Sequence, residues 1–206
     1  MARVTLKEQD LSFRRFVLNV ENVCLTDEQF FRLCSDNPEL NMELTAQKEL
    51  IIMPPAGLKS NWRENFLATE LTIWARKDGT GVAFSCNAGY VLPNSAKRAP
   101  DVSWIRRDRL AVFSDKELEK FGHLCPDFLA EILSPTNTLE ELRDKMDEYM
   151  ANGARLGWLI DPYEGHVYVY RPGKVAEELV NPATLSGDPV LPGFVLSVAE
   201  VLAGSW

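Results

Sequence analysis

Segment 126–135 places an ionisable carboxylate inside an apolar run that is typical of a buried β-strand. The run reads Pro-Asp-Phe-Leu-Ala-Glu-Ile-Leu-Ser-Pro, and Glu131 lies within it. Alternate residues of a strand share a face, so Glu131 should point the same way as Leu129 and Leu133. Both faces of the strand are apolar, and a carboxylate in such a place needs an ion pair, a hydrogen bond or a bound cation. The chain is therefore expected to form a sheet that holds one acid with a special role.

A second acid, Asp101, opens another short apolar run over residues 102–105, directly after Pro100. Proline suits the start of a strand because it donates no ladder hydrogen bond. If the two strands are neighbours, Asp101 and Glu131 can converge on a hard divalent cation such as Mg²⁺, which prefers oxygen ligands. The alternative is structural, with Asp101 as an ordinary first residue of a strand and Glu131 paired with one buried arginine or lysine. Spacing alone leaves both interpretations open.

Length and composition indicate one globular domain over residues 1–206, with residues 1–40 as an N-terminal extension packed on it. The chain has 46% hydrophobic and 25% charged residues, which is typical of a soluble protein. No apolar run approaches the roughly 18 residues of a membrane span. The N-terminus lacks the apolar core of a secretory signal, so a cytoplasmic location is expected.

The charge balance counts against a general DNA-binding protein, because the 22 basic and 30 acidic residues give a net charge of −8. A local basic group flanks the Asp101 strand and consists of Lys97, Arg98, Arg106, Arg107 and Arg109. This group either holds phosphates near the acid pair or forms a solvated rim of the sheet. The sequence leaves both roles of the basic group open.

Cysteine and histidine give little support for a zinc site or a histidine-rich metal centre. The four cysteines are scattered without a C-x-x-C pair, and only two histidines are present. We expect the cysteines to be small core residues.

The first half of the chain predicts a short helix capped by Thr26, a hairpin between residues 42 and 53, and a long amphipathic helix over about 60–77. Glu70 falls within the apolar sector of the long helix, so it is either a third acid aimed at the site or a snorkelling side chain. Glu64 is expected elsewhere on that helix. An extended segment follows over residues 82–92.

The second half predicts a parallel β-α-β unit. Thr138 and Glu141 form a capping box, the following helix has an apolar stripe, and the apolar run 156–160 reads as a buried parallel strand. Residues 167–170 predict an antiparallel return strand. Lys145 lies beside Tyr149 at the edge of the helix stripe, where its ammonium either reaches the end of the Glu131 strand or snorkels to solvent.

Several of these segments, taken in order, resemble the Uma2 family, a branch of the restriction-endonuclease-like PD-(D/E)XK superfamily. They are Pro-Asp-Val-Ser at 100–103, Glu-Ile-Leu-Ser-Pro-Thr at 131–136, Lys145, Tyr149, and Trp-Leu-Ile-Asp-Pro at 158–162. The resemblance extends over nearly the whole chain. It implies an α/β fold with a restriction-endonuclease-like core, in which helices flank a mixed central sheet and an N-terminal helix and β-hairpin extend it.

The same resemblance implies that Asp101 and Glu131 bind Mg²⁺ or Mn²⁺ in an endonuclease that hydrolyses phosphodiester bonds. The usual motif has a lysine two residues after the glutamate, where this chain has Leu133. In families of this kind the basic role moves to the next helix, which implies that Lys145 is the third catalytic residue. Glu43 matches an acid near the start of the family domain and is a further candidate without an assigned role.

By this resemblance the substrate is nucleic acid, with DNA favoured, and the protein is expected to be a homodimer. A competing hypothesis is a catalytically inactive nuclease fold that acts as a binding or regulatory module. The acidic net charge and Leu133 motivate that alternative. A metal enzyme that acts on another substrate with the same acids is a third possibility.

Overall fold

The computed structural model describes residues 15–204, so the first part of the predicted N-terminal extension lies outside the described residues. The larger sheet has six strands in the order β11-β10-β9-β8-β7-β4. They are β4 (Gly81–Ser85), β7 (Val102–Arg106), β8 (Phe128–Ile132), β9 (Leu156–Asp161), β10 (His166–Tyr170) and β11 (Glu177–Val180). Strands β8 and β9 run parallel and the other neighbours antiparallel. The predicted mixed sheet is confirmed.

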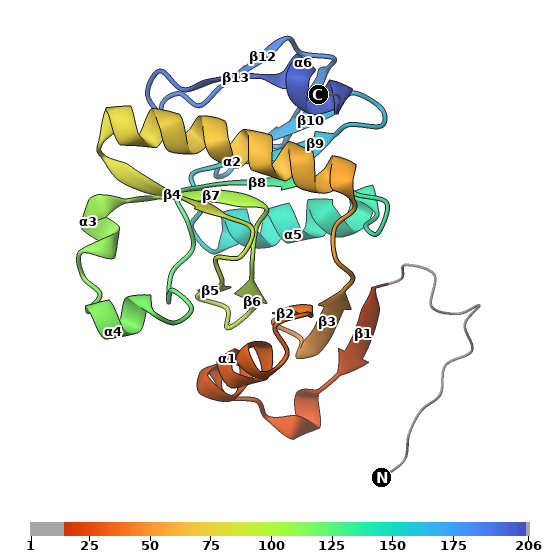
Figure 1. Cartoon of the computed structure of the whole chain (residues 1–206), viewed down its shortest axis with the longest axis vertical. Coiled ribbons are helices and arrows are strands. Elements are labelled where there is room, and N and C mark those ends of the chain that lie inside the picture. Colours follow the sequence, from red (N-terminus) through yellow and green to blue (C-terminus); the bar gives the residue numbers. More distant parts are fainter. Residues whose placement is uncertain (1–14, 205–206) are drawn as a thin grey trace.

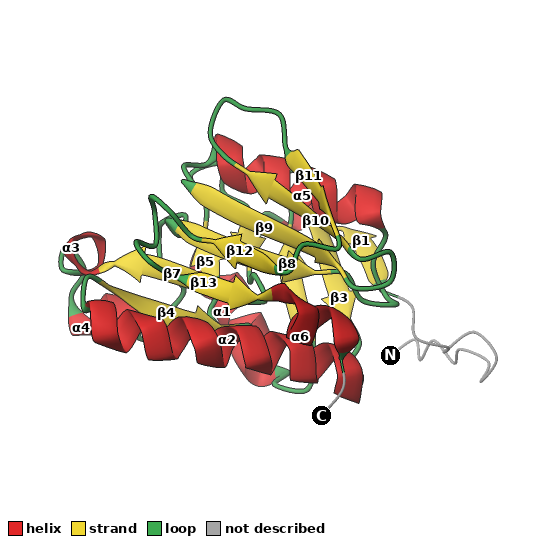
Figure 2. Ribbon diagram, turned by 90° about the horizontal axis from the view of Figure 1, so that it is seen from above, coloured by secondary structure: helices red, strands yellow, loops and turns green. Residues whose placement is uncertain are grey.

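Two helices cover opposite faces of the larger sheet, as Figures 1 and 2 show. Helix α2 (Leu58–Asp78) packs on the face that carries Trp104 and Trp158. Helix α5 (Leu139–Ala151) packs on the face that carries Leu129 and Leu159. The sheet is therefore buried on both faces, which explains why its central strands read as continuous apolar runs.

A smaller sheet joins the N-terminal segment to the chain that leads into β7. Its five strands lie in the order β1-β3-β2-β6-β5. They are β1 (Phe16–Asn19), β2 (Asn41–Leu44), β3 (Glu49–Met53), β5 (Tyr90–Val91) and β6 (Lys97–Arg98). Strands β2 and β3 are the predicted hairpin, which β1 extends on one side and β6 on the other. This sheet lies below the larger one in Figure 1.

Helix α1 (Asp27–Asp36) begins at the predicted Thr26, whose hydroxyl accepts a hydrogen bond from the Gln29 N–H. It packs Phe30 against the smaller sheet, in a buried cluster with Leu44 and Leu50. The hairpin and α1 are therefore anchored to each other by their own apolar residues.

The remaining elements lie at the periphery. They are the 3-10 helix η2 (Glu21–Val23), α3 (Arg107–Leu110), α4 (Asp115–Leu118), β12 (Thr184–Ser186), β13 (Val195–Ser197) and α6 (Val198–Ala203). Among residues 15–204 no helix combines the length and apolar character needed to cross a bilayer. The expectation that all cysteines are core residues is wrong for Cys24, which is exposed, whereas Cys125 is buried.

Candidate active site

The strand register brings Asp101 and Glu131 together. Strands β7 and β8 pair with Val102 opposite Ala130, and one further antiparallel step places Asp101 opposite Glu131. The Ile132 N–H donates a 2.7 Å hydrogen bond to Asp101 Oδ2, which fixes the aspartate against the end of β8. The two strands are therefore neighbours, which is the condition for Asp101 and Glu131 to share a cation.

Glu131 lies on the α5 face of the larger sheet, together with Leu129, as the alternation along the strand predicts. Its side chain is only 4% exposed. Lys145 Nζ lies 2.8 Å from Glu131 Oε1, and the Tyr149 hydroxyl donates a 3.2 Å hydrogen bond to the same oxygen. The buried acid thus has two partners, both from α5.

The sequence of α5 explains why those partners reach Glu131. The capping box starts the helix, because the Thr138 hydroxyl accepts from the Glu141 N–H and the Glu141 carboxylate accepts from the Thr138 N–H. The buried stripe of the helix then packs on the sheet. Since residues four apart lie on one side of a helix, Lys145 and Tyr149 both face the end of β8.

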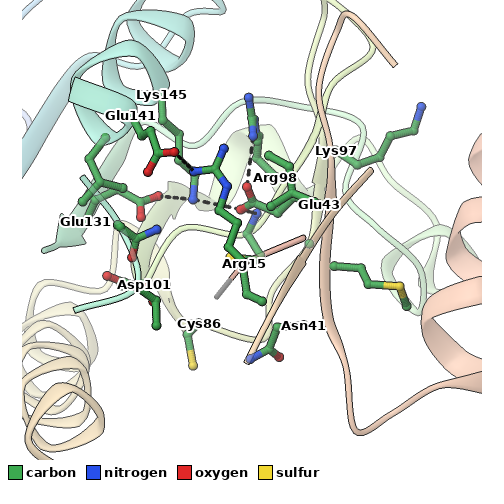
Figure 3. Close-up of a pocket in the computed structure, with 18 of the residues that line it drawn as sticks. Arg15, Asn41, Glu43, Cys86, Lys97, Arg98, Asp101, Glu131, Glu141 and Lys145 are labelled. Carbon is green, nitrogen blue, oxygen red and sulfur yellow. Dashed lines mark hydrogen bonds and ion pairs between the residues drawn. The ribbon is translucent and has the colours of Figure 1, made fainter. Parts of the chain in front are cut away.

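Glu43, from β2 of the smaller sheet, is the second acid in contact with Lys145. Lys145 Nζ lies 2.8 Å from Glu43 Oε1. Arg98 holds the other oxygen, Oε2, at 3.0 Å, and it also contacts Glu148 Oε2 at 2.6 Å. Figure 3 shows the resulting row of alternating charges, in which Lys145 stands between Glu131 and Glu43.

The surroundings shift the pKa values of these groups in opposite directions. Burial raises the pKa of Glu131 to about 8 against the effect of Lys145, and the charge on Asp101 adds to the rise. Burial and the charge on Glu64 raise the pKa of Asp101 to about 7. Burial alone would raise the pKa of Glu43, but Lys145 and Arg98 lower it. Several carboxylates therefore lie close together in a buried pocket, where Asp101 and Glu131 hold their protons to higher pH than ordinary carboxyl groups do.

The lysine, in contrast, is held in its charged form. Burial would lower the pKa of Lys145, but the carboxylates of Glu131 and Glu43 raise it. Its side chain is 12% exposed. Lys145 is therefore an ammonium in this arrangement, and the snorkelling alternative does not describe it.

Glu64, and not Glu70, is the acid of α2 at the site. Glu64 lines the pocket, and burial together with the charge on Glu131 raises its pKa to about 7. Glu70 is not among the pocket-lining residues, so the possibility that it is a third acid of the site is wrong. The face of α2 that packs on the sheet carries Leu67 and Leu71 and is offset from the predicted apolar sector, because Ile73 of that sector is exposed. Glu64 lies three residues before Leu67, on the buried side of the first half of the helix.

These residues surround a cavity of about 1010 Å³ between the two sheets. Its lining includes Arg15, Glu43, Glu64, Cys86, Asn87, Arg98, Asp101, Glu131, Asn137 and Lys145. Arg15 lies over this pocket and pairs with Glu141 at 2.8 Å, as Figure 3 shows. Sequence reasoning missed Arg15 and Cys86, because no motif or periodicity marks either residue.

Most of the predicted basic group is committed to local contacts. Lys97 lines the cavity but points away from the acids in Figure 3, and it pairs with Asp27 at 2.8 Å. Arg106 and Arg109 lie at and beyond the opposite end of β7, where they pair with Asp108 and Asp127 respectively. Arg107 donates to the Gly79 carbonyl nearby. Only Arg98 contacts the acids of the site.

The carboxylate oxygens of Asp101 and Glu131 fit a hard divalent cation whose other ligands are water or substrate. Asp101 Oδ2 accepts from Ile132 and Glu131 Oε1 contacts Lys145, while Asp101 Oδ1 and Glu131 Oε2 have no partner among residues 15–204. In the same part of the chain, no group of three or more His, Cys, Asp or Glu side chains forms a ready-made metal site. Magnesium commonly binds through one or two carboxylates and retains several waters. The two carboxylate oxygens without a partner match that mode.

Comparison with known proteins places the chain in a family. A structure described as a putative nuclease belonging to DUF820 from Anabaena variabilis ATCC 29413 has a TM-score of 0.71 and 22% identity, covering 87% of this chain and 98% of that one. No curated protein matches. The Uma2 family model, described as "Putative restriction endonuclease", matches residues 27–199. The chain therefore belongs to the Uma2 family, and the nuclease-like α/β fold that the resemblance implied is confirmed.

Proposed function

We propose that this protein is a metal-dependent nuclease that hydrolyses phosphodiester bonds in nucleic acid, with DNA as the favoured substrate. The observation that carries this proposal is the convergence of Asp101, Glu131 and the Lys145 ammonium on one pocket. The family description, "Putative restriction endonuclease", supports it. The pocket is large enough to admit a nucleotide with its phosphate.

In this proposal Asp101 and Glu131 would hold Mg²⁺ or Mn²⁺. Such an ion, when bound, polarises a phosphoryl oxygen and makes a coordinated water more acidic. The Ile132 N–H orients Asp101, and the Tyr149 hydroxyl orients Glu131. These contacts fix both carboxylates before any ligand arrives, which reduces the reorganisation that catalysis requires.

Lys145 acts in this proposal as a charged hydrogen-bond donor and not as a base. The pKa of Lys145 is raised by Glu131 and Glu43 against the effect of burial, so the amine keeps its proton near neutral pH. A fixed ammonium stabilises the negative charge that develops on a phosphate during attack, and it can orient the water by hydrogen bonding. Deprotonation of that water by Lys145 is disfavoured for the same reason.

We also propose that the active form is a homodimer. Among residues 15–204, strand β1 is an edge strand of the smaller sheet, and Phe16, Val17 and Leu18 on it are exposed. An apolar edge of this kind is suited to pairing with a second copy. Sedimentation of the wild-type protein and of Val17→Lys tests this part separately, because a variant with the same dimer content would contradict the role of β1.

The nuclease assignment is tested by incubating the protein with supercoiled plasmid DNA, single-stranded DNA and RNA, in Mn²⁺, in Mg²⁺ and in chelator. We expect metal-dependent cleavage of at least one substrate, and a loss of about 100-fold or more in Asp101→Asn and Glu131→Gln. Glu70→Gln is the matched control and should cleave like the wild type. Cleavage that persists unchanged in both site variants would contradict the assignment. Nucleic-acid binding without cleavage or metal binding would favour the inactive binding module.

A further inference from the structure

Lys145 is shared equally by two acids that come from different sheets. Its Nζ lies 2.8 Å from Glu131 Oε1 on the larger sheet and 2.8 Å from Glu43 Oε1 on the smaller one. The two carboxylates approach the ammonium from different elements, as Figure 3 shows. One cation thus connects the proposed metal-binding strand to the N-terminal hairpin.

Glu43 is held in place independently of Lys145. The Ala99 N–H donates a 3.0 Å hydrogen bond to Oε1, and Arg98 donates a 3.0 Å hydrogen bond to Oε2. Arg98 is itself fixed by Glu148, and Glu43 is only 3% exposed. Because both oxygens of Glu43 already accept hydrogen bonds from the chain, Glu43 is suited to anchoring a cation side chain and not to binding a metal.

Glu131 differs from Glu43 as a partner of Lys145, because under the proposed function Glu131 also binds the metal. A carboxylate that binds a divalent cation has less negative charge available for an ammonium nearby. Lysine has a long, flexible stem and makes no rigid forked contacts. With Glu131 as its only anchor, Lys145 would be free to leave the pocket at the stage when its charge is needed.

We propose that Glu43 is a positioning residue that keeps the Lys145 ammonium in the pocket when Glu131 is engaged by metal. This inference rests on the proposed function, since it requires a metal at Glu131. It assigns a role to the N-terminal hairpin, which would complete the active site and not merely extend the fold. Glu43 touches no reacting atom in this account and acts through Lys145.

The test measures how readily the Lys145 amine is modified by reductive methylation at fixed pH, with and without Mn²⁺, using peptide mass spectrometry. The wild-type protein should protect Lys145 in both conditions. Glu43→Gln should protect it without Mn²⁺, because Glu131 still pairs with it, and should expose it about tenfold more when Mn²⁺ is present. Exposed Lys116 is the internal standard, and buried Lys97 should not respond to Mn²⁺.

A second variant tests whether the position of the Glu43 carboxylate matters or only its charge. Glu43→Asp keeps the negative charge beside Arg98 and Ala99 but withdraws the carboxylate by one methylene from Lys145. We expect it also to expose Lys145 in Mn²⁺. Wild-type behaviour in Glu43→Asp would show that only the charge matters and would overturn the inference. This variant also serves as the test if Glu43→Gln does not fold.

The outcomes distinguish this inference from the proposed function. If Mn²⁺ binds the wild type through Glu131 and Lys145 stays protected in both Glu43 variants, the inference is wrong and the metal site stands. If Lys145 in Glu43→Gln becomes equally reactive with and without Mn²⁺, Glu43 holds Lys145 whether or not metal is bound, and the inference is also wrong. If Glu131→Gln does not change Mn²⁺ binding, both proposals fail together. In a cleavage assay, Glu43→Gln should lower kcat and leave KM nearly unchanged.

Discussion

Lys145 Nζ lies 2.8 Å from Glu131 Oε1, so helix α5 supplies the cation beside the acid of strand β8. The usual motif would place this cation two residues after the acid, but Leu133 occupies that position and packs in the apolar cluster under α5. The basic group of this site therefore depends on the packing of α5 and on the Thr138 capping box that starts the helix.

Replacing Lys145 should separate catalysis from metal binding. In Lys145→Met the ammonium that stabilises the developing charge is lost, and we expect cleavage to fall by about 100-fold to 10,000-fold. Mn²⁺ binding should be equal or tighter, because a cation that competes for Glu131 has been removed. Calorimetry and a cleavage assay on the same preparation check both effects, and weaker Mn²⁺ binding in this variant would contradict the account.

Moving the lysine back to the strand should restore part of the lost activity. Leu133 directly follows β8 and packs against the same apolar cluster as Leu129, so a lysine at 133 stands at the usual motif position on the α5 side of the sheet. We expect Leu133→Lys combined with Lys145→Met to cleave about tenfold faster than Lys145→Met alone. If the double variant is folded by circular dichroism but cleaves no faster than Lys145→Met, the ammonium in this pocket must come from helix α5.

The two glutamates of α2 should behave differently. The charge on Glu64 is one of the causes that raise the pKa of Asp101, together with burial. Glu64→Gln should therefore lower the pKa of Asp101, and the pH at which Mn²⁺ binding reaches half its maximum should fall. Glu70→Gln, outside the pocket, is the matched control and should leave the profile unchanged. Identical profiles in both variants would remove Glu64 from the site.

The metal-free protein should lose stability as the pH rises through the raised pKa values. Glu131 titrates at about 8 and Asp101 at about 7 in the folded chain, against ordinary values near 4.5 and 3.8. Between these limits the folded state keeps protons that the unfolded state has released, so the free energy of unfolding falls with increasing pH. Thermal melts from pH 5 to pH 8 should show a declining Tm. The decline should be smaller in Glu131→Gln, and an equal slope in both proteins would contradict these pKa shifts.

The residues that could be predicted from the sequence are those marked by a local pattern. Glu131 stands out because apolar residues surround it on a strand, and Asp101 because it follows Pro100 at the start of the neighbouring run. Helical periodicity placed Lys145 beside Tyr149 and left contact with Glu131 and snorkelling both open, and the family resemblance favoured the contact that the structure has. Each signal depends on a repeat within one element, which sequence alone can show.

The parts that could not be predicted depend on how separate elements meet. Glu43 contacts Lys145 only because β2 pairs with β6 and brings the smaller sheet against the end of the larger one. Strand β6 is two residues long, too short for a periodic signal. Glu64 was passed over because the apolar sector predicted for α2 lies on a different side of the helix from the face that packs on the sheet. Tertiary contacts of this kind leave no local pattern.

Metal binding by Asp101 and Glu131 is tested by calorimetric titration of Mn²⁺ into the wild-type protein, Asp101→Asn, Glu131→Gln and Glu70→Gln at low salt and pH 7.5. We predict saturable binding in the wild type and in Glu70→Gln, and at least about tenfold weaker binding in each of the other two variants. Equal binding in all four proteins, or no binding in the wild type, would contradict the assignment of Asp101 and Glu131 as the metal-binding acids.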